Sequence, residues 1–117
     1  MQIYKIFDLC GPHCVSIEEG EKVRKIIVDN FNNGKTIELD FNGVQTLTSS
    51  FLNSAIGRLY GDFEKSKIEN FLGVKGLDKS DEALMAIVIK NAIEFYAKDQ
   101  RAREAARDVI KDLKEDN

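Results

Sequence analysis

The sequence has little of what exported, membrane-spanning or hydrolytic proteins usually carry. It holds one histidine, one proline and two cysteines. It has no run of about 18 apolar residues, so it predicts no transmembrane span. The N-terminus shows no charged segment followed by a long apolar run, so no signal peptide is evident. Two cysteines in a chain without such a signal predict free thiols in a reducing cytoplasm.

The charge balance limits the class of partner. The formal net charge is −3, which argues against nonspecific binding to nucleic acid or anionic membranes, because both need a surplus of positive charge. Hydrophobic residues make up 43% of the chain, enough for a real core. We predict a single domain over residues 1–117, with its core over 1–97 and a charged helical extension over 98–117.

Hydrophobic periodicity predicts strands that alternate with helices. We expect strands over 2–9, 36–41 and 68–74, and helices over 16–31, 49–63 and 81–97. Such alternation implies parallel crossovers in at least part of a sheet, which is the architecture of an α/β fold. Ser16 followed by Glu19 forms a capping box at the start of the first helix.

The C-terminal segment predicts a long helix. From Lys98 to Lys114 the chain has no glycine or proline and is rich in alanine and charged residues. A single helix from Asp81 to Lys114 would be about 50 Å long, which exceeds the width of a small domain. It must therefore fold back or project to a partner. We expect a homodimer or partner contact through the apolar residues Ala102, Val109 and Leu113.

A strand, a turn and a helix follow one another at the centre of the chain. Apolar and polar residues alternate over 36–41, as in a strand with one buried face, and Asn42-Gly43 follows as a turn. Ser49 and Ser50 stand at the start of the next helix. A hydroxyl there can cap free N–H groups, and an added phosphate would be favoured by the helix dipole. Cap and phosphoacceptor are therefore alternative roles for these serines.

Two runs in this stretch resemble a known family. Leu39-Asp40-Phe41-Asn42-Gly43-Val44 and Ser49-Ser50-Phe51 are similar to the strand end and helix start of the STAS-like family of unknown function. That family is related to the STAS anti-sigma factor antagonists of bacteria, and the resemblance covers residues 16–96. It implies a STAS-like α/β fold, with a mixed or parallel sheet, helices packed on it and here a long C-terminal helix. Thr48 and Phe51 depart from the STAS pattern, which has an acidic residue and a glycine there.

The same resemblance implies a function. STAS antagonists are non-enzymatic protein-interaction domains in transcription signalling, switched by serine phosphorylation and partnered with an ATP-binding, kinase-like regulator. By its position, Ser49 matches their phosphoacceptor, and Ser50 follows it. We therefore expect a cytoplasmic signalling domain that binds a protein partner. The residues expected to contact that partner are Thr46, Thr48, Ser49, Phe51 and Asn53.

Two other functions stay open on the residues alone. Asp40 with Thr46, Thr48 and Ser49 would line a polar pocket at the carboxyl end of a strand, where open α/β sheets bind ligands. Such a pocket would belong to a ligand-binding domain or an enzyme. No histidine and no nucleophile–base pair accompanies these residues, so we expect no enzyme activity, no catalytic residue and no cofactor. Alternatively, the terminal helix would make the chain a self-assembling structural subunit.

Cys10, His13 and Cys14 are close enough in sequence to contribute to a zinc site. A closed site needs a fourth ligand, and the chain has no other cysteine or histidine. We therefore expect a turn around Pro12 with free thiols and no metal.

Overall fold

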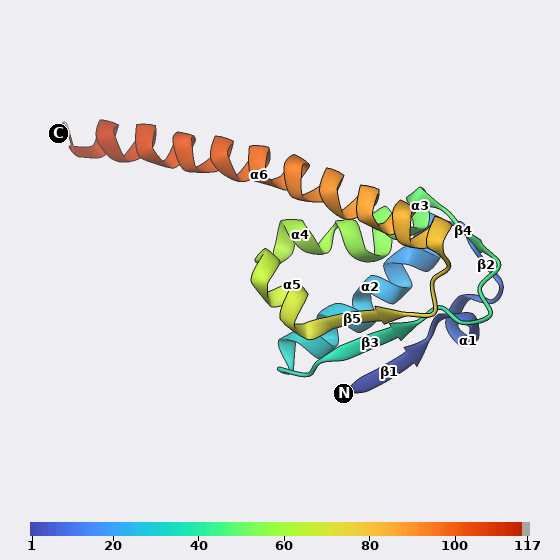
Figure 1. Cartoon of the computed structure of the whole chain (residues 1–117). Coiled ribbons are helices and arrows are strands. Elements are labelled where there is room, and N and C mark those ends of the chain that lie inside the picture. The colour runs from blue at the N-terminus through green and yellow to red at the C-terminus, as the bar shows by residue number, and fades with distance from the viewer. Residues whose placement is uncertain (116–117) are drawn as a thin grey trace.

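A computed structural model of the chain describes the backbone of residues 1–115 and the side chains of residues 1–98. Helices cover one face of a small parallel sheet, and one long helix extends beyond it (Figure 1). The strands are β1 (Gln2–Lys5), β2 (His13–Cys14), β3 (Ile37–Asp40), β4 (Thr46–Leu47) and β5 (Leu72–Lys75). The helices are α1 (Ile6–Cys10), α2 (Ile17–Asn32), α3 (Ser49–Leu52), the π-helical turn η1 (Asn53–Gly57), α4 (Leu59–Asp62), α5 (Lys65–Phe71) and α6 (Lys79–Glu115).

The main sheet has the strand order β1–β3–β5, and both neighbouring pairs are parallel. Helices lie in each connection between neighbours, which confirms the predicted parallel crossovers. In β3, Ile37 and Leu39 are buried, whereas Glu38 between them faces the other side and pairs with Lys75 at 3.3 Å. Ile3 shares that side and is 54% exposed. The alternation predicted for β3 is therefore confirmed for Ile37, Glu38 and Leu39, whereas Asp40, predicted on the polar face, is buried at the end of the strand.

Helix α2 begins where its capping box predicted. The Ser16 hydroxyl accepts the backbone N–H of Glu19 at 3.1 Å. Val23, Ile27 and Phe31 recur on one side of the helix and are buried in the core. This face packs toward the sheet and toward the helical segment formed by α3, η1 and α4.

The segment 49–62, formed by α3, η1 and α4, lies between α2 and α6 (Figure 1). Its contact with α2 is close because α2 carries Gly20 at the crossing. A Cβ at Gly20 would lie 2.7 Å from the carbonyl oxygen of Phe51 and 2.7 Å from the Cβ of Ser54. The Ser54 hydroxyl donates to the carbonyl oxygen of Ile17 at 2.8 Å across the same contact. Only a residue without a side chain fits at position 20 without a shift of one helix.

The predicted strand over 2–9 was wrong in its second half. The strand ends at Lys5, and α1 follows directly. Ile6, Leu9 and Cys10 are spaced three and four residues apart, which is the helical period, and all three pack on the core cluster. Burial of this short stripe favours a helical turn over continued extension.

The predicted strand over 68–74 was also too long. Residues 65–71 form α5, and the strand β5 begins only at Leu72. Ile68 is buried, and Phe71 meets the ring of Phe31 edge-on at 6.1 Å. Short apolar runs fit either structure, and packing decides between them.

The long C-terminal helix is confirmed as one unbroken element, α6. Its buried residues Met85, Val88 and Ala92 pack on α3, η1 and α4, and Tyr96 covers Gly61. Beyond this contact the helix projects past the rest of the chain (Figure 1). The longest dimension is therefore 62 Å, against 28 Å and 23 Å for the other two.

Two sequence predictions concern the far part of α6. The oligomer contact through Ala102, Val109 and Leu113 falls outside the side chains that the structure describes, so it stays a prediction. Within the described residues, no helix combines the length and the apolar character that crossing a membrane requires.

Replacement of Gly20 by alanine tests the α2 contact. We expect Gly20→Ala to lower the free energy of unfolding by about 1–3 kcal/mol, because the added methyl group overpacks the crossing. Gly57→Ala is the matched control, since its Cβ would meet the Asn53 side chain at 3.3 Å and the side chains of Ala92 and Val88 at 3.7 Å, without a backbone contact. There we expect no loss and a gain of up to about 1 kcal/mol from helix propensity. Urea unfolding followed by circular dichroism measures both, and equal stability of the two variants would contradict the proposed close contact.

Candidate functional site

Asp40 fixes the turn that leads from β3 into the candidate site. Its carboxylate accepts the backbone N–H of Asn42 at 2.9 Å and the Asn42 side-chain amide at 2.7 Å. The pKa of Asp40 is lowered, first by the Asn42 backbone hydrogen bond and further by the Asn42 amide and the ammonium groups of Lys75 and Lys5, against the opposing effect of burial. The carboxylate is therefore ionised at neutral pH and serves the turn.

The loop after this turn is held by the chain segment around Pro12. The carbonyl oxygen of Pro12 accepts the N–H groups of Gln45 and Thr46. β2 and β4 pair in parallel, and Nδ1 of His13 lies 2.8 Å from the Thr46 hydroxyl. The Thr48 hydroxyl donates to the carbonyl oxygen of Val15 at 3.1 Å. The hydroxyls of Thr46 and Thr48 are thus engaged within the protein, as is the Asp40 carboxylate. These contacts argue against the predicted ligand pocket.

Thr48 is the residue that caps the helix. Its hydroxyl oxygen accepts the N–H of Phe51 at 3.3 Å, and its carbonyl oxygen accepts the N–H of Leu52 at 3.1 Å. Ser49 and Ser50 form the exposed first turn that follows. Two roles were predicted for Ser49 and Ser50, a helix cap and a phosphoacceptor. Thr48 provides the cap in their place.

An exposed polar strip runs from the loop into the helix. We call it the serine face, and it consists of Thr46, Thr48, Ser49, Ser50 and Asn53, of which only Thr48 is half-buried. Phe51 was predicted to contact the partner, but its side chain is fully buried. Two residues along a helix turn the side chain to the opposite side, so Phe51 anchors the helix in the core while Ser49 faces outward. Phe51 is therefore removed from the predicted contact surface.

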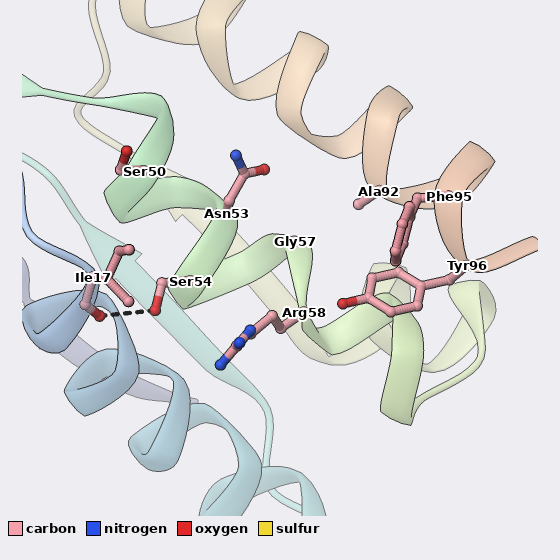
Figure 2. A pocket seen from close by; sticks show the side chains of 9 residues that line it. All are labelled: Ile17, Ser50, Asn53, Ser54, Gly57, Arg58, Ala92, Phe95 and Tyr96. Atoms are coloured by element: carbon pink, nitrogen blue, oxygen red, sulfur yellow. Dashed lines mark hydrogen bonds between the residues drawn. The ribbon is translucent and has the colours of Figure 1, made fainter. Parts of the chain in front are cut away.

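The π-helical turn η1 adds a cavity beside the serine face. The N–H of Arg58 donates to the carbonyl oxygen of Asn53 at 3.0 Å, five residues back, where an α-helix would bond four residues back. The cavity beside this turn holds about 340 Å³ between α2, η1 and α6 (Figure 2). It is lined by Ile17, Ser50, Asn53, Ser54, Gly57, Arg58, Ala92, Phe95 and Tyr96.

Ser50 and Asn53 belong to both the serine face and the cavity. Figure 2 shows the side chain of Arg58, the residue after η1, extending toward α2, with the Tyr96 ring approaching from α6. The guanidinium lies 3.5 Å from Glu21, but both groups are exposed, so this ion pair contributes little stability. No local pattern in the sequence predicts the cavity, because the α6 residues in its wall are far from η1 along the chain.

The Cys10 and Cys14 thiols are neighbours, but the His13 ring lies apart from them. β2 exposes His13 and buries Cys14 on its other side, and within the described residues no group of three metal-binding side chains gathers. Burial raises the pKa of Cys10, and burial with the neighbouring Cys10 and Glu19 raises the pKa of Cys14 to about 12. Both thiols therefore stay protonated at neutral pH and are weak nucleophiles and weak metal ligands.

The architecture and the serine face can now be set against known proteins. A family model described as the STAS-like domain of unknown function (DUF4325) matches residues 19–82. The chain belongs to this family. The match runs from the first turns of α2 to the start of α6 and includes the serine face, so the predicted family and its STAS-like α/β fold are confirmed. Neither the comparison with curated proteins nor the comparison with solved structures returned a match.

Stability measurements separate the cap of this STAS-like domain from its exposed serines. We expect Thr48→Ala to lower the free energy of unfolding by about 1 kcal/mol, because the Phe51 N–H loses its acceptor. Ser49→Ala should stay within about 0.5 kcal/mol of the wild type, as exposed substitutions usually do. Chemical denaturation of both variants checks this difference. A larger loss for Ser49→Ala than for Thr48→Ala would show that the serine is the cap.

Thiol labelling tests the environment of Cys14. In a Cys10→Ser variant we expect almost no reaction of the native protein with Ellman's reagent at about pH 8, because burial, the largest cause of the raised pKa of Cys14, remains when Cys10 is replaced. The thiol is also fully buried. In guanidinium the unfolded variant should react rapidly, with one thiol labelled per chain. Rapid labelling of the native variant would contradict the buried, protonated thiol.

Proposed function

We propose that this STAS-like domain is a non-enzymatic regulator that binds another protein through its serine face. The observation that carries the proposal is the separation of roles between Thr48 and Ser49. Thr48 caps the helix and ties it to Val15, whereas the Ser49 side chain is exposed in the first turn. The fold therefore needs the threonine, and the serine is available for recognition or modification.

Phosphorylation of Ser49 would act on binding without unfolding the domain. A phosphate there adds about −1.5 to −2 charges in the first turn of a helix, where the helix dipole and free N–H groups favour an anion. The modified serine face would remain in place but carry a strong negative charge. A partner surface that is apolar or acidic would then be expelled.

The partner class in this proposal is an ATP-binding, kinase-like regulator. It rests on the family relation to STAS domains and on the place of Ser49 in the motif, and it includes a signalling role in the bacterial cytoplasm. His13 lies apart from the neighbouring thiols of Cys10 and Cys14, and the Asp40 carboxylate is engaged in a turn. The described side chains therefore favour binding over chemistry.

Affinity capture with charge variants tests the switch. Wild-type, Ser49→Ala and Ser49→Asp chains are used as baits in lysate of the native host, with ATP and Mg²⁺ present. We expect a kinase-like ATP-binding protein on the first two baits and its loss on Ser49→Asp, because the carboxylate imitates part of the phosphate charge. Mass spectrometry identifies the captured proteins and reports any phosphate on Ser49.

Ser66→Asp is the matched control, since Ser66 is an exposed serine in the first turn of another helix, α5. It should retain every partner of the wild type. If the Ser49→Asp and wild-type baits capture the same proteins, the hypothesis that charge at position 49 controls binding is wrong. Equal loss on Ser66→Asp would show that added charge acts nonspecifically.

A further inference from the structure

The outer edge of β5 offers unpaired main-chain groups. β5 is an edge strand of the sheet and pairs only with β3 among the described strands. The carbonyl oxygen of Lys75 accepts the N–H of Phe41 at 2.9 Å, so the main-chain groups of Lys75 point toward β3. The N–H and C=O groups of successive residues in a strand point to opposite sides. The N–H and C=O groups of Val74 therefore point away from β3. An edge of this kind is a template for a further strand.

An apolar trough runs along this free edge. Two cavities of about 320 Å³ and 240 Å³ adjoin β5, and Leu72, Val74, Met85 and Ile89 line both of them. The first two side chains come from β5 and the last two from α6, which crosses above the edge. Val74 is 37% exposed although its side chain belongs to the core face of the sheet. The trough is therefore wide enough to leave an apolar strand residue partly uncovered.

The two ends of the trough carry negative charge. Glu69 of α5 lines the cavity at the start of β5, and Glu82 of α6 lines the cavity at its end. Lys75 also lines the second cavity, but its ammonium group is paired with Glu38 at 3.3 Å. Glu69 has Lys65 at 3.7 Å, but both side chains are more than half exposed, so this pair neutralises the site only weakly. An occupant with basic residues on both sides of an apolar centre would complement these carboxylates.

We propose that the β5 edge binds an extended segment of a partner protein as a fourth strand, with alternating apolar residues under α6 and Lys or Arg at both flanks. Only an extended chain can pair with the free main-chain groups of Val74, and its alternate side chains would enter the trough. A second copy of β5 is the poorer occupant. In an antiparallel pair its Glu82 would approach Glu69 of the first copy and repel it.

This surface shares no residue with the serine face, so it stands or falls independently of the proposed switch. Its test is a titration of the full chain, labelled with ¹⁵N, with the synthetic peptide Lys-Lys-Val-Thr-Val-Thr-Val-Lys-Lys. We expect amide shifts in β5 and around Ile89, together with slower hydrogen exchange at the Val74 N–H. Absence of shifts in β5 at millimolar peptide, or shifts confined to other elements, would overturn the proposal.

Two altered peptides separate the two sources of affinity. N-methylation of the central valine removes a main-chain donor and should weaken binding about tenfold. Replacement of the four lysines by glutamates should weaken binding most at low salt, because the rim carboxylates then repel the flanks. Equal affinity of all three peptides would show nonspecific adhesion to an apolar surface and overturn the assignment.

Protein variants complete the test. Ile89→Glu places a charge in the wall of the trough and should abolish binding, whereas Ile87→Glu, on the exposed side of the same helix, should bind as the wild type does. Val74→Pro removes the outward N–H from an edge position where proline is tolerated, and should weaken binding about tenfold. Sedimentation of the free chain checks the other occupant. If the wild type is a dimer and Val74→Pro is a monomer, the edge binds a second copy of the chain, and the proposal is overturned.

Discussion

The close contact between α2 and the segment 49–62 determines where the serine face lies. Because Gly20 has no side chain, Ser54 and the Phe51 carbonyl lie directly against the backbone of α2. The Ser54 hydroxyl donates to the carbonyl oxygen of Ile17 at the same contact. Six residues earlier, at the cap of α3, the Thr48 hydroxyl donates to the carbonyl oxygen of Val15. Two successive points of the segment are thereby tied to the chain that leads into α2. The first helical turn, between them, is held rigidly with its outer side free.

A surface held in this way can change its charge without cost to the fold. Phe51 and Leu52 on the inner side are fully buried and bind the turn to the core. Ser49 and Ser50 on the outer side are exposed, and the cap hydroxyl comes from Thr48. In the proposed switch, modification of the outer side would change what binds there, while the anchoring residues would keep their contacts. This separation is what a reversible interaction domain requires.

Local signals in the sequence predicted the parts of the fold that depend on neighbouring residues. The alternation in β3, the N-cap at Ser16 and the turn at Asn42-Gly43 each follow from a few adjacent side chains and were confirmed. The assignments of α1 and α5 as strands failed because a short apolar run fits either period, and only packing decides. The cavity beside η1 arises from contact with α6, which no local pattern encodes. The identity of the cap was also hidden, because three adjacent hydroxyl residues satisfy the same preference.

Helix α6 connects the two proposed surfaces. Ala92, Phe95 and Tyr96 form the wall of the cavity beside the serine face, while Met85 and Ile89 form the wall of the trough along β5. The part of α6 that reaches both is fixed to the domain mainly through one stripe, in which Val88 is buried against the helical layer. A shift of α6 along this stripe would change the width of the cavity and of the trough together. If both proposed surfaces bind partners, such a shift is the physical route by which occupancy of one would alter the other.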